Sequence, residues 1–244
     1  MLCLSQGIVG FGRDRESLPV QLGLKAFSYC LVSHNTTASS DLILTTKRGC
    51  GKRPSAKIQY TPFVLNPVLY PDYYYVWLQN ISISSVDVKV PAKYLVLDKK
   101  GNGGTIVDLG TTFTLMAKPV FDLVYKELER QVGSNYSRAS KIEQEIGLKP
   151  YYNVSVDHKD KIKFPQLTFH FQGGVEMVLP FDNYFSYGDN DSSVVCMTIK
   201  KGGEDDLGPA IILGNYQQQD YYMEYDLEFN RLGILQQKCK SRIV

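Results

Sequence analysis

Short apolar segments separated by glycine, proline and polar turns run along most of the chain. Apolar and polar positions alternate with a period of two in many of them, which predicts β-strands. The clearest hairpin covers residues 74–90, where the alternation breaks once near Ser84-Ser85. Further strand candidates are residues 27–32, 41–44, 162–171, 175–179, 194–199, 210–213, 221–227 and 232–235. We therefore predict a mostly β chain.

Helical periodicity is confined to few places. Residues 119–132 carry five apolar positions on one face, with Pro119 at the start and Gly133 after the end, which predicts an amphipathic helix packed on a sheet. A shorter helix is predicted from Ser140 to Gly147, where Glu143 would complete a capping box. One helical turn is also expected over residues 17–23.

One apolar segment leads directly into a candidate functional group. The sequence GGTIVDLGTTF places a short buried strand before Asp108, and Gly110 removes the Cβ that would block a tight turn. The hydroxyls of Thr111 and Thr112 follow at a distance where they can donate to the carboxylate. The turn therefore presents Asp108 in a defined orientation. Taken alone, this tetrad fits an ordinary Asp-Gly turn equally well.

Composition narrows the class of protein and of partner. At 244 residues with 43% hydrophobic content, the chain can form one large domain or two small ones. Lys and Arg number 27 against 25 Asp and Glu, without a basic block, so neither nucleic acid nor an anionic membrane is predicted as a partner. No run of 18 apolar residues predicts a membrane span.

Metal and cofactor sites are not predicted either. The five cysteines are scattered, and the three histidines lie at no ligand spacing. The glycines at residues 10–12 lack the third glycine and long helix of a dinucleotide loop, and residues 99–104 lack the ending of a phosphate loop.

Five Asn-x-Ser/Thr sequons exceed the one or two expected from composition and favour a secreted, disulfide-bearing chain. They lie at Asn35, Asn80, Asn135, Asn153 and Asn190. The first six residues have neither a basic nor a long apolar region, so no signal peptide is predicted in this chain.

Two apolar elements ending in glycine form the one internal repeat, Ile8-Val9-Gly10 and residues 210–214. The order of the Asp108 segment, a helix, the ILGNYQQQ segment at residues 212–219 and the EYDL segment at residues 224–227 closely resembles plant pepsin-like aspartic proteases of the nepenthesin type. The resemblance extends from about residue 7 to residue 239.

The resemblance implies a fold and a chemistry. It implies a pepsin-like lobe built as a six-stranded-type β-barrel with one or two short helices: residues 1–26 would be a remnant of the N-terminal lobe, and residues 27–240 the C-terminal lobe, similar to the C-terminal part of xylanase inhibitors. It implies an aspartic endopeptidase acting on peptides, in which Asp108 is catalytic and Gly110, Thr111 and Thr112 support its loop. The second catalytic Asp would belong to the N-terminal lobe, upstream of Met1, and the pair would share one proton.

Two departures from the family pattern bear on activity. Leu109 stands where the resemblance implies Ser or Thr, whose hydroxyl would bond across to the opposite lobe. The segment around Tyr151 has tyrosine in place of the cysteine that would pair with Cys196, so Cys196 is expected to be unpaired. The resemblance makes Cys30 and Cys239 the disulfide candidate and leaves the states of Cys3 and Cys50 open.

These departures leave alternatives open. The chain alone is expected to be weakly active or inactive, because one Asp cannot supply both the acid and the base. It could instead be a non-catalytic pepsin-like binding or inhibitor protein, or the product of a truncated gene. Pairing of two such chains around two copies of Asp108 is disfavoured by Leu109. The family implies secretion to the apoplast, or the vacuole.

Overall fold

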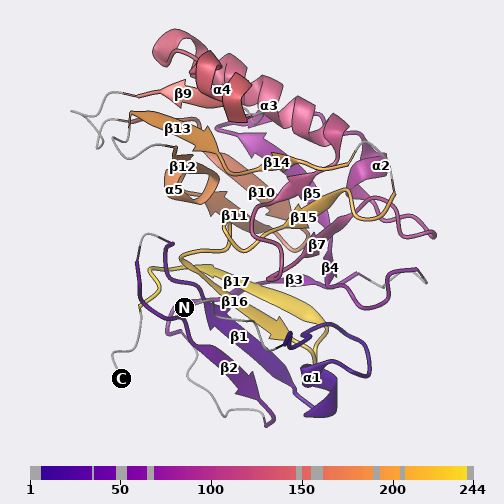
Figure 1. Ribbon diagram of the computed structural model, residues 1–244. Coiled ribbons are helices and arrows are strands. Elements are labelled where there is room, and N and C mark those ends of the chain that lie inside the picture. Colours follow the sequence, from indigo (N-terminus) through magenta and orange to yellow (C-terminus); the bar gives the residue numbers. More distant parts are fainter. Residues whose placement is uncertain are drawn as a thin grey trace.

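The computed structural model describes residues 7–34, 36–47, 54–64, 69–146, 150–154, 162–188, 193–203 and 207–240. This part of the chain is mostly β with a few short helices, as predicted. Figure 1 shows a five-stranded sheet in the lower half of the molecule and three further sheets above it, with α3 and α4 along the upper edge.

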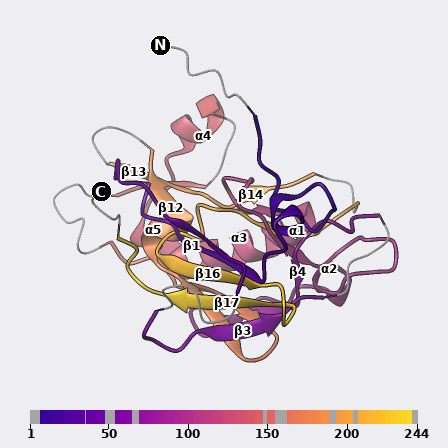
Figure 2. The same ribbon diagram turned by 90° about the horizontal axis from the view of Figure 1, so that it is seen from below.

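The lower sheet combines strands from the two halves of the chain. Its order is β2 (Leu42–Thr45), β1 (Ala26–Cys30), β16 (Tyr221–Asp226), β17 (Arg231–Gln236) and β3 (Gln59–Pro62). Neighbouring strands are antiparallel throughout. Figure 2 shows β1, β16, β17 and β3 side by side from below. All six residues of β16 are buried, and β16 is the central strand of the five.

Three further sheets build the upper part. The second sheet contains β11 (Val175–Leu179), β10 (Leu167–Phe171), β5 (Leu78–Ile83) and β6 (Val86–Asp87). The third contains β12 (Phe185–Tyr187), β13 (Val194–Met197) and β9 (Tyr151–Asn153). The fourth contains β14 (Lys200–Lys201), β8 (Leu115–Met116), β15 (Ile211–Leu213), β7 (Thr105–Val107) and β4 (Tyr75–Val76). The predicted hairpin is formed by β5 and β6, and Ser84 turns it with φ of 51°.

The amphipathic helix is confirmed as α3 (Lys118–Val132), and its five predicted apolar positions are all buried. The other helices are short: α1 (Leu18–Gln21), α2 (Ala92–Leu95), α4 (Ser140–Ile146), α5 (Phe181–Tyr184) and a 3₁₀ turn at Gly133–Asn135. The expected capping box at α4 is wrong. Glu143 instead accepts hydrogen bonds from Arg138 Nε and from the backbone N–H of Tyr151, both at 2.8 Å, so its carboxylate ties α4 to β9.

One continuous core joins the lower sheet to the upper ones. Phe27 of β1 stacks on Tyr225 of β16 with ring centroids 4.4 Å apart, and Tyr74 meets Tyr225 edge to face at 4.7 Å. These aromatic contacts lie between the lower sheet and the segment that leads into β4. The core therefore fixes the position of the fourth sheet, which carries the candidate site.

Candidate active site

Asp108 follows directly after β7, a strand that is buried over its whole length. The strand pairs in parallel with β15, so that Val107 lies beside Leu213. The backbone N–H of Asp108 donates to the carbonyl of Leu213 at 3.1 Å. Two adjacent parallel strands therefore hold the start of the loop, and Asp108 leaves the sheet from a rigid base.

The loop orients both oxygens of the Asp108 carboxylate. Oδ1 accepts the backbone N–H of Gly110 at 2.8 Å, and Oδ2 accepts the Thr111 hydroxyl at 2.6 Å. A Cβ at position 110 would lie 3.2 Å from Oδ1, which is tighter than ordinary contact. Thr112 is exposed, and its contribution is the backbone carbonyl that accepts the N–H of Tyr216. Asp108 itself is half-buried, so its carboxylate is held in place and still reachable.

The segment after β15 packs against the Asp108 loop from the other side. A Cβ on Gly214 would lie 2.6 Å from the carbonyl carbon of Phe113, so only glycine permits this approach. The N–H of Asn215 donates to the Thr111 carbonyl at 2.8 Å, and Asn215 Nδ2 donates to the Leu109 carbonyl at 2.9 Å. The two loops thus form one hydrogen-bonded unit.

Three consecutive glutamines support this unit from inside. Gln217 is fully buried; its Oε1 accepts from both the N–H and the hydroxyl of Thr114, and its Nε2 donates to Asn183 O and Thr198 Oγ1. Gln218 Nε2 donates to the carbonyl of Leu213 at 2.9 Å. In the sequence these glutamines belong to the ILGNYQQQ segment, whose pattern predicts no structural role for them. The only available signal was a polar run directly after a buried strand.

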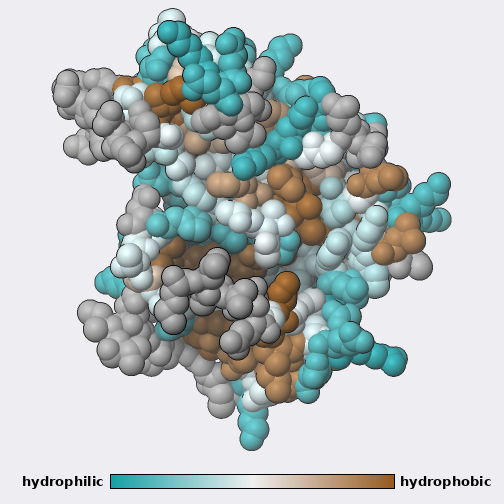
Figure 3. Space-filling view, in the orientation of Figure 1, coloured by the Kyte–Doolittle hydropathy of each residue, from teal (hydrophilic) through white to brown (hydrophobic). Residues whose placement is uncertain are grey.

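A cavity of about 420 Å³ opens beside Asp108. Its remaining lining residues are mostly apolar or aromatic: Ile8, Val9, Gly10, Phe11, Gly12, Phe27, Tyr29, Asp72, Tyr73, Tyr74, Ile106, Val107, Leu109, Gly110 and Tyr225. Ile8 and Val9 are 98% and 65% exposed, and Leu109 is 38% exposed. Figure 3 shows apolar surface gathered over the lower half of the molecule. The carboxylate thus lies next to apolar groups that the described chain leaves uncovered.

Two buried tyrosines, Tyr29 and Tyr225, line this cavity and interact electrostatically with the Asp108 carboxylate. The Tyr29 hydroxyl donates to Gln218 and lies 3.3 Å from the Tyr225 hydroxyl. Burial raises the pKa of both phenols, and the charge of Asp108 raises each further. Both therefore remain protonated and act as neutral hydrogen-bonding groups in the wall of the cavity.

The predicted disulfide is present: Cys30, at the end of β1, is bonded to Cys239 with a Cα–Cα distance of 5.5 Å. Cys196 is unpaired, as expected, and lies directly opposite Tyr151 in the pairing of β13 with β9. Cys3 and Cys50 lie outside the described residues.

The sequons occupy different settings. Asn80 lies in β5 and donates from Nδ2 to Asp87, whereas Asn135 is exposed in the 3₁₀ turn. Asn153 lies at the end of β9 and donates from Nδ2 to the Ser137 hydroxyl at 2.9 Å. Asn35 and Asn190 lie outside the described residues.

Metal-binding clusters and membrane-spanning helices are not found among the described residues. In the described ranges, no three His, Cys, Asp or Glu side chains come together in a way that could hold a metal ion. The helices described in Figure 1 are all too short or too polar to cross a membrane.

An acidic turn on paired parallel strands, crossed by a glycine-led segment, defines the lobe of a pepsin-like protein. Solved structures share this fold. The crystal structure of edgp superposes with a TM-score of 0.79 at 21% identity, covering 95% of this chain and 60% of its own. Basic 7S globulin from soybean gives 0.76 at 18% identity, covering 98% and 61%.

Sequence comparison defines the family. The family described as "Xylanase inhibitor C-terminal" matches residues 73–236, and this chain belongs to it. A probable aspartyl protease of Arabidopsis thaliana, At4g16563, is 35% identical over 273 residues, covering 96% of this chain and 54% of its own. Aspartic proteinase nepenthesin-2 of Nepenthes gracilis is 28% identical, covering 96% and 50%. The chain is thus a C-terminal lobe of the plant pepsin-like aspartic protease type, and it spans about half the length of these relatives.

Proposed function

We propose that this chain supplies the C-terminal lobe of an aspartic endopeptidase and that Asp108 is one of its two catalytic carboxylates. The observation that carries the proposal is the double anchoring of Asp108, by Gly110 N–H and the Thr111 hydroxyl, at the edge of an open cavity. Family membership supports the same chemistry. The substrates would be peptides or proteins.

In this proposal the second carboxylate belongs to a preceding lobe, of which residues 1–26 are the last part. Two carboxylates in close contact share one proton, so one acts as the base that activates a water while the other protonates the scissile carbonyl. This mechanism is the general one for a carboxylate dyad. Among the described residues, the Asp108 carboxylate is hydrogen-bonded to Gly110 and Thr111 and to no second carboxylate, and Leu109 offers no hydroxyl to the opposing loop. The isolated chain should therefore cleave weakly or not at all.

Cleavage of a denatured protein at acid pH tests the proposal. The purified chain is assayed alone and with an N-terminal lobe of nepenthesin-2 added as a separate polypeptide, each with and without a statine-type inhibitor. We expect statine-sensitive cleavage only in the mixture, stronger with Leu109→Ser and abolished by Asp108→Asn. Gel filtration of each mixture shows whether the lobes associate. Associated lobes that stay inactive with Leu109→Ser would contradict the catalytic assignment of Asp108.

A second candidate function is a non-catalytic binding or inhibitor protein. Leu109 favours it, since it removes a side chain that the catalytic loop would use, and the description of the family names xylanase inhibitors. Inhibition of a microbial xylanase by the chain, unchanged by Asp108→Asn, would support this function. An absence of both inhibition and binding would reject it for that enzyme class.

The proposed setting is an extracellular or vacuolar compartment. The Cys30–Cys239 disulfide fits an oxidising environment, because such bridges are rare in reducing ones. Exposed Asn135 is the described sequon whose side chain is best placed to carry a glycan. Peptide mapping of the chain from a eukaryotic secretion host would measure occupancy at each of the five sequons.

A further inference from the structure

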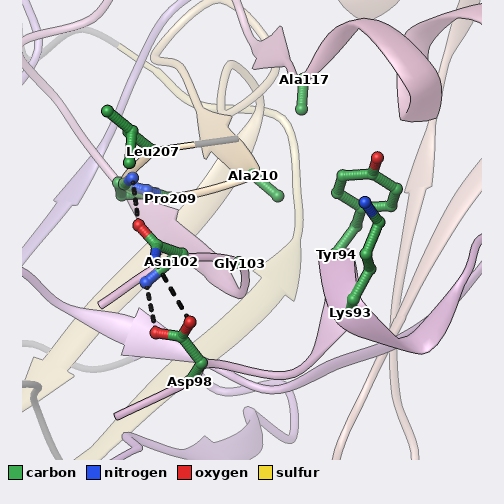
Figure 4. Close-up of a pocket in the computed structure, with 10 residues that line it drawn as sticks. Lys93, Tyr94, Asp98, Asn102, Gly103, Ala117, Leu207, Pro209 and Ala210 are labelled. Carbon is green, nitrogen blue, oxygen red and sulfur yellow. Dashed lines mark hydrogen bonds between the residues drawn. The ribbon is translucent and has the colours of Figure 1, made fainter. Parts of the chain in front are cut away.

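Two polar side chains in the cavity beside α2, Asn102 and Asp98, are bonded within the chain. Figure 4 shows this space of about 240 Å³, in which Asn102 Nδ2 donates to Asp98 Oδ2 at 3.2 Å and Asn102 Oδ1 accepts the N–H of Gly208 at 3.0 Å. On its other side, Lys93 Nζ lies 4.5 Å from the centre of the Tyr94 ring. By contrast, one edge of the lower sheet offers backbone N–H and C=O groups that pair with no described strand.

This edge is formed by β2. The strand pairs with β1 on one side, and no described strand pairs with its other side. Figure 1 shows β2 at the outer border of the lower sheet, next to β1. Its residues Leu42 and Leu44 are 47% and 39% exposed. An edge strand with exposed apolar side chains is a template for a further strand, because its outward backbone groups still need partners.

The opposite edge of the same sheet, formed by β3, is protected. β3 ends in Pro62, which has no N–H to offer to a further strand. The turn at Gly173 contacts the backbone of β3, where a Cβ on Gly173 would lie only 2.9 Å from the carbonyl oxygen of Tyr60. β2 contains no proline, glycine or charged residue. The two edges therefore differ, and β2 is the one that is open to a further strand.

The charges that flank β2 match a second copy of the same strand. Asp41 lies directly before β2, Lys47 lies two residues after its end, and both are exposed. Hydrogen-bonded and non-hydrogen-bonded pairs alternate along antiparallel strands, so two identical strands related by a two-fold axis must place one residue opposite its own copy. When that residue is Leu44, Asp41 of each copy lies opposite Lys47 of the other. An axis at Ile43 or Thr45 loses this match, so charge complementarity selects both the partner and the register.

We propose that two copies of this chain associate through antiparallel pairing of their β2 strands about a two-fold axis at Leu44. The pairing joins two five-stranded lower sheets into one continuous sheet. Leu44 packs on the partner's Leu44, Leu42 lies within diagonal reach of the same pair, and an Asp41–Lys47 ion pair flanks it on each side. No residue of β2 lines the cavity beside Asp108, so the association stands apart from the proposed peptidase function.

A disulfide cross-link tests the register. Residues that lie opposite each other in antiparallel strands have Cα atoms about 4.5–5.5 Å apart, which is within disulfide range. Leu44→Cys should therefore form a cross-linked dimer under mild oxidation, and peptide mapping should join position 44 to position 44 of the partner. Thr46→Cys is the matched control, because it lies two residues further on the same face and opposite the partner's Leu42. The parent chain, oxidised in the same way, controls for its own cysteines. Cross-linking of Thr46→Cys in preference to Leu44→Cys would overturn the register.

Charge reversal tests the partner. Asp41→Lys and Lys47→Asp each replace two attractive pairs by two repulsive ones, so each variant alone should dimerise roughly tenfold or more weakly than the parent. Mixing the two variants restores attraction at both pairs and should restore the dimer. Sedimentation velocity of the full chain, from micromolar to millimolar concentration, measures each equilibrium, because a contact of one strand with one strand belongs to the weak class of interfaces. A mixture that associates no better than the single variants would contradict the proposed ion pairs.

Leucine substitutions separate β2 from other apolar surface. Leu44→Lys should abolish the dimer, whereas Leu207→Lys, which replaces a leucine that is 75% exposed outside the lower sheet, should leave it intact. Circular dichroism checks that each variant is folded. A parent chain that stays monomeric over the whole range would overturn the proposal and leave this edge to a strand of another polypeptide, such as a preceding lobe. A dimer that is unchanged by Leu44→Lys and by both charge reversals would place the contact elsewhere and overturn it as well.

Discussion

The close packing of Gly214 against the Asp108 loop predicts a large penalty for a single methyl group. A Cβ there would lie 2.6 Å from Phe113 C and 2.7 Å from Thr112 O, and both contacts are backbone atoms that cannot rotate away. Ordinary contact begins at 3.4 Å, so the loops would have to separate by about 0.8 Å. Gly214→Ala should therefore strain the whole two-loop unit.

The separation can be converted into a free energy of unfolding. Asn215 N–Thr111 O and Tyr216 N–Thr112 O are both 2.8 Å hydrogen bonds, and a shift of about 0.8 Å would stretch them beyond the length of a real bond. Losing two such bonds costs about 1 kcal/mol each, and overpacking adds a cost of about 1–3 kcal/mol. We expect Gly214→Ala to lower the free energy of unfolding by about 3–5 kcal/mol.

Gly10→Ala is the matched control, because Gly10 ends the other apolar element of the internal repeat. A Cβ at that position would meet nothing within 4 Å. Urea unfolding, followed by far-ultraviolet circular dichroism, should place Gly10→Ala within about 0.5 kcal/mol of the parent, as for other surface changes. Equal stability of the two variants, with unchanged m-values, would refute the claim that close loop packing requires glycine at position 214.

Three further predictions concern other parts of the molecule. Tyr151→Cys should form a disulfide with Cys196, its direct neighbour across the strands. In urea unfolding, the bridge should raise the free energy of unfolding by up to about 4 kcal/mol relative to a control that carries both Tyr151→Cys and Cys196→Ser. The absence of a cross-linked peptide would count against this prediction. Hydrogen bonds from Arg130, and then from Gln131, lower the pKa of Glu127 to about 2. The ionised carboxylate therefore stabilises the fold above its unfolded pKa near 4.5, and this stabilisation is lost as the pH falls toward 2. Glu127→Gln should make the unfolding temperature less dependent on pH between these values, and a pH profile identical to that of the parent would argue against the pairing. Desolvation of the half-buried Cys196 raises the pKa of its thiol, so iodoacetamide at pH 8 should label Cys196 more slowly than free cysteine, as peptide mapping would show. Equally fast labelling would contradict this desolvation.

Local sequence patterns predicted much of the fold. Alternation located the hairpin at residues 74–90, and the helical period located all five buried positions of α3, because each of these patterns depends on one element burying one face. The strand and turn around Asp108 could also be read locally. Those residues fix their own geometry, through Gly110 and Thr111, within three positions of the carboxylate.

What sequence could not supply depends on partners far along the chain. Gln217 is a polar residue with 0% exposure, and only the position of Thr114 and Asn183 in space makes its burial possible. Glu143 was expected to cap its own helix, but its carboxylate instead accepts hydrogen bonds from Arg138 Nε and from the backbone N–H of Tyr151.

The lower sheet sets the order in which the chain can fold during synthesis. In this sheet, β16 pairs with β1 and β17 pairs with β3, so strands from the two ends of the chain are neighbours. The disulfide partners Cys30 and Cys239, separated by 209 residues, join the same two regions. A ribosome releases β1 long before its central partner exists, and contacts of such long range form slowly. During synthesis, β1 and β3 therefore each have an unpaired edge until β16 and β17 have been made. A chain that stops before residue 221 would keep these edges unpaired, so it would be prone to aggregate and to bind chaperones.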